Sequence, residues 1–182
     1  ERYRVLRKIA EGGFGAIDEA EHELTKRRVA LKRLHAHLTA RADVVERFRR
    51  EALAASAIRH RHIVDVTDMG RLPDGSVFVA LEYLDGRDLA REIKDAGALP
   101  LRRALHVATQ LCDALGAAHA AGIVHCDLKP ENVVLVSRDG DADFVKVVDF
   151  GISKFRDADG EAPTATGAVL GTPQYMAPEQ VN

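Results

Sequence analysis

The side chains best suited to chemistry lie in residues 125–132, which read HCDLKPEN between two apolar runs. Asp127, Lys129 and Asn132 place an acid, an amine and a carboxamide within six residues. Pro130 stiffens this loop, because its ring fixes φ and removes a backbone donor. Seventeen residues after Asn132, Asp149 follows a second apolar strand. Two acids and an amide at the ends of adjacent strands suit a hard cation bound through oxygen, with one acid left for proton transfer.

A glycine cluster made of Gly12, Gly13 and Gly15 lies between two expected strands near the start of the chain. Glycines let the backbone approach a ligand closely and aim N–H groups at phosphate. On its own, the cluster is more typical of an ordinary glycine-rich hairpin. Phosphate binding at this loop therefore depends on what else the chain carries.

Lys32 ends an apolar strand, where a lysine is usually a surface residue whose stem covers apolar side chains. The helix expected over residues 43–58 adds a second observation. Val44, Phe48, Glu51 and Ala55 recur in it at helical spacing, so one glutamate lies on the apolar stripe. A buried carboxylate without a partner is costly. The pattern therefore predicts a basic partner for Glu51, in preference to a surface glutamate on a frayed helix.

The elements that would position these residues follow from hydrophobic periodicity and turn signals. A turn at Pro73-Asp74-Gly75 is expected between two strands. His60 and His62 have no further ligands at metal-binding spacing, so they are interpreted as structural. The expected elements, in order, are three strands within residues 1–33, a helix over 43–58, strands over 66–71 and 76–83, helices over 89–95 and 101–121, and strands over 133–136 and 144–148.

The longest expected helix covers residues 101–121 and ends at Gly122. Its polar residues His106, Gln110 and Asp113 make it amphipathic, so it is not interpreted as a membrane span. The apolar residues recur with a helical period and predict the face that packs on a core. They lie at positions 101, 104, 105, 108, 111, 112, 115 and 118.

The composition is that of a soluble globular protein, with 182 residues, 46% hydrophobic and 30% charged. A net charge of −2 gives no reason to expect a nucleic-acid or membrane partner. Cys112 and Cys126 are the only cysteines, so no disulfide framework is expected and a reducing, cytoplasmic location is favoured. Residues 1–8 carry alternating charge and do not resemble a secretory signal.

Taken in order, these motifs resemble those of the eukaryotic-type protein kinases, and the loop sequence DLKPEN resembles the serine/threonine branch. The sequence GTPQYMAPEQ at 171–180 resembles bacterial serine/threonine kinases in particular. The resemblance covers almost the entire chain. It implies an α+β two-lobe fold, with an antiparallel-sheet N-lobe carrying one helix and a mainly helical C-lobe. Residues 1–84 would form the N-lobe and hinge, and residues 85–182 the first half of the C-lobe through the activation segment. The matching segments are the glycine loop, VALK at 29–32, Glu51, DLKPEN at 127–132, DFG at 149–151 and APE at 177–179.

The resemblance implies an enzyme that transfers the γ-phosphate of Mg-ATP to Ser or Thr hydroxyls of proteins. Asp127 would accept the proton of the substrate hydroxyl, and Lys129 would contact the γ-phosphate. Thr172 would hydrogen-bond near both of them. Autophosphorylation would occur at Thr164 and Thr166, in the activation segment. The implied partners are ATP and proteins with Ser or Thr, whereas the oligomeric state stays open.

The nucleotide and metal roles are also implied by the resemblance. Lys32 would hold the α- and β-phosphates and Glu51 would position it. Asn132 and Asp149 would carry Mg²⁺. The full set implied to bind the nucleotide is Ala10, Gly12, Gly13, Gly15, Ile17, Ala30, Lys32, Leu81, Glu82, Leu84, Asp88, Val134 and Asp149.

Three positions depart from the family pattern. Ala10 stands where the family has the first glycine of the loop, which predicts weaker nucleotide binding. Ala55 stands where the family packs a larger apolar residue, which predicts a less firmly seated helix. Cys126 stands where the family has the arginine that pairs with the phosphorylated activation segment. Because a thiol cannot make that charge-assisted bond, activity is expected not to depend on phosphate at Thr164 or Thr166 in the usual way.

Two other functions remain open at this point. The first is a scaffolding pseudokinase, which the departures would permit, although a binding module has no need of Lys32, Asp127, Asn132 and Asp149 together. The second is a kinase-like small-molecule phosphotransferase, which would not need the peptide-presenting segment at residues 171–179, GTPQYMAPE. The serine/threonine protein kinase is the favoured interpretation.

Overall fold

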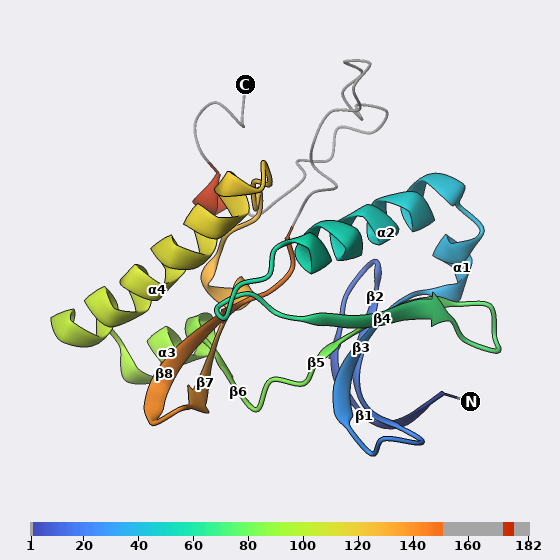
Figure 1. The fold of residues 1–182 in the computed structure, drawn as a ribbon, viewed down its shortest axis with the longest axis horizontal. Helices are drawn as coiled ribbons and strands as arrows, with labels where there is room; N and C mark the ends of the chain where they lie inside the picture. Colours follow the sequence, from blue (N-terminus) through green and yellow to red (C-terminus); the bar gives the residue numbers. More distant parts are fainter. Residues whose placement is uncertain (1, 151–172, 177–182) are drawn as a thin grey trace.

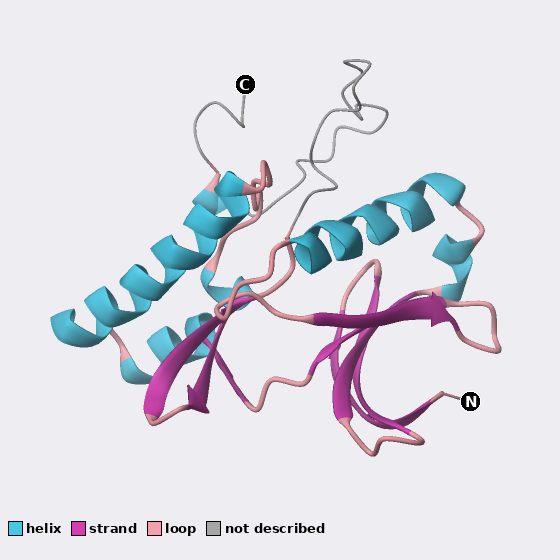
Figure 2. Cartoon of the chain, in the orientation of Figure 1, coloured by secondary structure: helices cyan, strands magenta, loops and turns pink. Residues whose placement is uncertain are grey.

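The computed structural model describes residues 2–150 and 173–176. The chain forms two lobes joined by a short connection after β5 (Figures 1 and 2). One lobe is a five-stranded sheet with a helix across it, and the other is mainly helical with a three-stranded sheet. The α+β two-lobe fold expected from the sequence is therefore confirmed. None of the helices in the described ranges is long and apolar enough to cross a membrane.

The N-terminal lobe is an antiparallel sheet with strand order β1-β2-β3-β5-β4. Two helices lie between β3 and β4 in the chain, and the longer one, α2, lies across one face of the sheet (Figure 1). The elements are β1 (Tyr3–Glu11), β2 (Gly15–His22), β3 (Arg28–Leu34), α1 (Ala36–Thr39), α2 (Ala42–Ala57), β4 (Val66–Arg71) and β5 (Val77–Glu82).

The alternation of side chains along β3 explains how Lys32 comes to face α2. Val29 and Leu31 are buried in the core on one side of the sheet. Leu34 points to the other side, where it packs with Phe48 of α2. Since successive side chains of a strand alternate between faces, Lys32 shares the side of Leu34. The strand therefore directs one lysine into the space between the sheet and the helix.

The C-terminal lobe combines helices with a small antiparallel sheet of order β6-β7-β8. Its core contains the inner face of the longest helix and the apolar residues of β7 and β8. The elements are β6 (Gly86–Asp88), α3 (Leu89–Ala96), α4 (Leu101–Ala120), β7 (Val133–Arg138) and β8 (Asp141–Val147), with short 3₁₀ turns at Pro130–Asn132 and Pro173–Tyr175.

The expected elements agree with these bounds to within a few residues, and the turn at residues 73–75 is present. Asp74 Oδ1 accepts hydrogen bonds from the backbone N–H and the hydroxyl of Ser76, and Gly75 N donates to Leu72 O at 2.9 Å. Among the helices and strands, two were not predicted: the four-residue helix α1 and the three-residue strand β6. Strand β6 exists because Gly86 and its neighbours pair with β7, a long-range contact that has no local sequence signal.

The prediction of the packed face of α4 was correct for Leu111 and Ala118, which pack on the core, and wrong for the first half of the helix. Leu101 and Leu105 are 75% and 58% exposed, whereas the buried positions are Val107, Gln110, Ala114 and Ala118. The reason is the polar residue in the middle of that face. Gln110 Nε2 donates to Asp143 O at 3.0 Å, and its Oε1 accepts from Val145 N at 3.0 Å. A glutamine bonded to the backbone of β8 thus occupies the centre of the interface, which apolar periodicity cannot reveal.

The connection between α2 and β4 is bound to the C-terminal lobe. His62 O accepts from Val147 N at 2.8 Å, and Val64 N donates to Val147 O at 3.0 Å. These bonds place Ile63 beside Val147 in a parallel bridge. His62 is buried and its Nδ1 bonds Val145 O at 2.9 Å. The histidine thus has a structural position at the junction of the lobes.

Candidate active site

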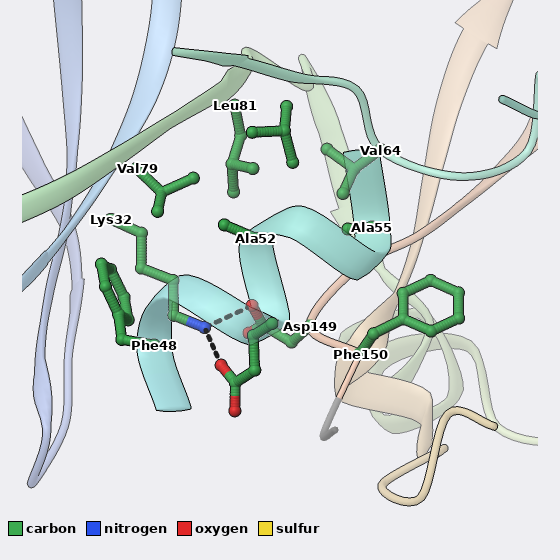
Figure 3. A pocket seen from close by; sticks show the side chains of 11 residues that line it. Lys32, Phe48, Ala52, Ala55, Val64, Val79, Leu81, Asp149 and Phe150 are labelled. Atoms are coloured by element: carbon green, nitrogen blue, oxygen red, sulfur yellow. Dashed lines mark hydrogen bonds and ion pairs between the residues drawn. The ribbon is translucent and has the colours of Figure 1, made fainter. Parts of the chain in front are cut away.

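Three charged side chains from three separate elements meet beside α2 (Figure 3). Lys32 Nζ on β3 lies 2.7 Å from Asp149 Oδ1, just after β8, and 4.0 Å from Glu51 Oε2 on α2. Lys32 is 28% exposed, so it is shielded without being sealed. Burial alone would lower the pKa of Lys32, but the charges of Asp149 and Glu51 and the bond to Asp149 outweigh it and raise that pKa above its ordinary value.

Glu51 takes the position predicted from the stripe on α2. Phe48, Ala52 and Ala55 are buried on this face of the helix, and Glu51 is partly buried between them. Ala52 and Ala55 line a hollow that also borders Lys32 and Phe150 (Figure 3). The small side chains leave this space open. The sequence alone indicated Glu51 as a residue needing a basic partner, and the structure places Lys32 Nζ 4.0 Å from its carboxylate.

His125 ties the loop of residues 125–132 to the strand that ends at Asp149. Its Nε2 donates to Val148 O at 3.0 Å, and its Nδ1 accepts from Asp127 N at 3.3 Å. One nitrogen donates while the other accepts, which is the pattern of a neutral imidazole. Burial lowers the pKa of His125, which favours the same neutral form. His125 also packs against Phe150, with ring centroids 4.7 Å apart.

The loop is held in register by Asn132. Its side-chain nitrogen donates to Asp127 O at 2.9 Å. Its backbone carbonyl accepts from Val148 N at 3.0 Å. Asn132 therefore links Asp127 to Val148, the residue before Asp149, although Asp127 and Asp149 are 22 residues apart in the sequence.

Asp127 and Lys129 form an ion pair of their own, with Nζ 3.1 Å from Oδ2 and both side chains partly exposed. Two non-glycine residues beside the site have left-handed backbones, Cys126 with φ 60° and Asp149 with φ 55°. Such conformations cost about 1 to 3 kcal/mol each and cluster at functional sites. The hydrogen bonds made by His125 and Asn132 hold the neighbouring backbone and so keep Cys126 and Asp149 in these conformations.

The two ends of the glycine loop differ in their freedom. A Cβ built on Gly12 would meet no atom within 4 Å, whereas one on Gly15 would lie 2.0 Å from Arg33 O. Gly15 is therefore required by the close approach of β2 and β3, while Gly12 lies in open space. Gly13 is equally open. Ala10 pairs with Ile17 beside an irregularity in β1, within an ordinary strand.

The remaining predicted nucleotide residues lie on the sheet and on the connection between the lobes. Ile17 is opposite Lys32, and Ala30 is opposite Leu81, so their side chains share a face. Asp88 caps α3, since its Oδ1 accepts from Arg91 N at 2.9 Å, and it is paired with Val134 across β6 and β7. The role of Asp88 in nucleotide binding stays a prediction. Glu82 ends β5, and Leu84 lies in the connection that follows.

Lys146 is the residue at this junction that sequence reasoning missed. It lies on β8 with a side chain only 2% exposed, and its Nζ contacts Glu82 Oε1 and Ile63 O. A signal was present, since a lysine among the valines of VKVV must either snorkel outward or find a buried partner. The partner could not be read from the sequence, because it lies 64 residues away.

Comparison with known proteins adds the family. Residues 3–182 match the model described as the protein kinase domain. The chain belongs to this family. The kinase domain is 47% identical over 182 residues to the serine/threonine-protein kinase Pkn1 of Myxococcus xanthus, covering 98% of this chain and 25% of that protein. It is 42% identical over 184 residues to PknA of Mycobacterium tuberculosis, covering 98% of this chain and 41% of that protein.

Among solved structures, the kinase domain is similar to the PknI kinase domain of M. tuberculosis. The TM-score is 0.69 at 32% sequence identity, and the match covers 83% of this chain and 59% of that one. The chain thus spans about a quarter of Pkn1 and less than two thirds of the PknI chain. Several predicted residues lie outside the described ranges, namely Gly151, Thr164, Thr166, Thr172 and the APE segment at 177–179.

Proposed function

We propose that this kinase domain transfers the γ-phosphate of Mg-ATP to Ser or Thr hydroxyls of proteins, including its own. The observation that carries the proposal is the meeting of Lys32, Glu51 and Asp149 beside a loop that holds Asp127 and Asn132. The names of Pkn1 and PknA as serine/threonine-protein kinases support the substrate class. Phosphoryl transfer asks a protein mainly to position reactants and neutralise charge, and this is what the set can do.

Asp127 would be the general base. Its carboxylate is partly exposed and lies 3.1 Å from Lys129 Nζ, so a hydroxyl reaching it would also approach a cation. Asp127 would accept the hydroxyl proton, and Lys129 would contact the γ-phosphate as charge builds on it. Lys32, with its raised pKa, would stay protonated at neutral pH and hold the α- and β-phosphates.

Asn132 and Asp149 would hold Mg²⁺, and their donor chemistry fits it. Asn132 uses its side-chain nitrogen on Asp127 O, so the carboxamide oxygen is the atom left to face a cation. Within residues 2–150 and 173–176, no group of three or more His, Cys, Asp or Glu side chains could hold a metal. Mg²⁺ commonly takes one or two protein ligands plus substrate phosphates. When bound, it would neutralise charge on those phosphates.

The adenine would lie against the connection between the lobes. Glu82 N already donates to Asp65 O at 2.9 Å, so Glu82 would offer its carbonyl to the adenine, and Leu84 would offer its N–H. Leu81, Ala30 and Ile17 would border the base from the shared sheet face. We expect weaker binding than in relatives with a glycine in place of Ala10.

The test is transfer of label from γ-³²P-ATP by the intact protein that carries this chain, beside its Asp127→Asn variant. We expect label on Ser or Thr in the wild type and a loss of at least about a hundredfold in the variant. Equal labelling in both would overturn the proposal and favour a scaffolding role. Label on a sugar or drug, with none on any protein, would favour a small-molecule phosphotransferase.

A further inference from the structure

Lys146 is a buried cation that the proposed chemistry does not use. It lies on β8, three residues before Asp149, with its side chain 2% exposed. Its Nζ donates to Glu82 Oε1 and, at 3.0 Å, to Ile63 O. Glu82 Oε1 also accepts from Asp65 N at 2.9 Å. A single carboxylate oxygen of Glu82, in the hinge that connects the lobes at residues 82–84, therefore joins β8 to the connection that runs from α2 to β4.

The residue after Glu82 is held from the opposite lobe. The guanidinium of Arg28, on β3, lies 4.0 Å from the centre of the Tyr83 ring, and Arg7 Nη2 donates to the Tyr83 hydroxyl at 3.2 Å. Both arginines pair with the buried Glu19, at 2.5 Å and 2.8 Å. The side chains of two consecutive hinge residues thus bond to different lobes, Glu82 to Lys146 of the C-terminal lobe and Tyr83 to the arginines of the N-terminal lobe.

A buried ion pair is a costly way to stabilise a fold, because a well-packed apolar pair is often equally stable. What such a pair adds is a fixed geometry, since a lysine ammonium bonded to two fixed acceptors can take only one position. The bond from Glu82 N to Asp65 O, at 2.9 Å, and the ion pair with Lys146 together hold Glu82, so Lys146 contributes to where the Glu82 carbonyl lies. The same strand sets where Asp149 lies three residues later.

We propose that Lys146 is a positioning residue that holds the hinge in the one place where its backbone distinguishes adenine from guanine. This inference rests on the proposed function. Adenine offers an amino donor where guanine offers a carbonyl acceptor. The Glu82 carbonyl accepts from the first and repels the second only when its position is fixed. Without Lys146 the hinge shifts and the preference for ATP over GTP falls.

The experiment measures the dissociation constants of Mg-ATP and Mg-GTP by calorimetry on the intact protein that carries this chain. In Lys146→Met we expect the preference for ATP over GTP to fall about tenfold, the worth of one polar contact. The double variant Glu82→Leu with Lys146→Met leaves no unpaired buried charge, so it keeps the fold if the single variant does not. It is expected to lose the preference as well.

The matched control is Arg103→Met, which removes a different, partly buried cation that is also bonded to β8, through Asp143 at 2.7 Å. It is expected to keep the preference. An unchanged ratio in the folded Lys146 variants, or an equal fall in the control, would overturn this inference alone. ATP binding by the wild type without phosphoryl transfer would overturn only the proposed function, since the ratio still decides the role of Lys146. A wild type that binds neither nucleotide overturns both.

Discussion

Two lysines cross the junction between the lobes in opposite directions, and they differ in how much water reaches them. Lys32 extends from the N-terminal lobe to Asp149, is 28% exposed and has a second carboxylate, Glu51, at 4.0 Å. Lys146 extends from the C-terminal lobe to Glu82 and is 2% exposed. A cation that keeps some solvent access can exchange a carboxylate for a phosphate. A sealed one cannot, so it fixes geometry instead.

The pairs also differ in what surrounds them. Lys32 borders a hollow lined by Ala52 and Ala55, where a ligand or a small shift of α2 can be accommodated (Figure 3). Lys146 is enclosed by the backbone of Ile63 and by Glu82. On the proposals made above, the same pairing of charges would serve catalysis at Lys32 and positioning at Lys146. The predictions below test this distinction in order of decreasing effect.

Replacing Lys32 should separate activity from stability most clearly. For Lys32→Met in the intact protein we expect kcat/KM for ATP to fall about a thousandfold, because a cation is lost where phosphate charge must be neutralised. The free energy of unfolding should change by less than about 1 kcal/mol, since all three partners are partly exposed. Steady-state kinetics and urea unfolding measure the two effects. Lys94→Met, on the exposed side of α3, should change neither, and retained activity in Lys32→Met would refute the assignment.

Replacing Lys146 should have the opposite profile. For Lys146→Met we expect a loss of about 3 kcal/mol in the free energy of unfolding, because Glu82 keeps a charge without its cation. Urea unfolding of the intact protein measures it. The double variant with Glu82→Leu should recover most of the loss, since both charges are then absent. Unchanged stability in the single variant would show that the Lys146–Glu82 pair is not a structural contact shielded from water.

The glycine loop offers a smaller contrast of the same kind, between Gly15, which is packed against β3, and Gly12, which has open space around it. Gly15→Ala should cost about 2 kcal/mol, because its Cβ would lie 2.0 Å from Arg33 O and the strands must move apart. Gly12→Ala should cost much less, since nothing lies within 4 Å of the added atom. Thermal unfolding of both variants provides the measurement. Equal losses at the two positions would contradict the difference.

The features that could be predicted from the sequence are those with a local signal. The stripe containing Glu51 indicated a carboxylate in need of a partner, and α2 covers Ala42–Ala57, close to the expected range. The residues of 125–132 indicated a polar loop between two apolar runs, and the structure has β7 begin at Val133. The fold class followed from the family resemblance. Each of these depends on residues close together in the chain or on an ordered set of motifs.

The features that escaped prediction depend on contacts across the fold. The packed face of α4 was partly misjudged because Gln110 is buried through two bonds to the backbone of β8, so polarity did not indicate exposure. The Glu82–Lys146 pair joins residues 64 apart. The roles of Asp127 and Asn132 came from resemblance, since the residues alone indicated a cation site without specifying a substrate. Hydrogen bonds between residues far apart in the chain leave no periodic pattern in the sequence.

The smallest expected effect is a pH dependence of folding stability that comes from His62, at the junction between the lobes. Burial lowers its pKa, and the nearby charge of Arg61 adds to this against the bond to Val145 O. As the pH falls through about 6.5, the unfolded chain binds a proton there before the folded chain does. Folding stability should therefore fall with acidification, by at most about 1.4 kcal/mol per pH unit from this group. In His62→Asn, which keeps a side-chain donor, the slope of unfolding free energy between pH 7 and pH 5.5 should be smaller. An identical slope would mean that His62 has the same pKa in the folded and the unfolded chain. Protons would then reach the junction between the lobes in the folded protein, and the junction would be more open to solvent than the burial of Lys146 indicates.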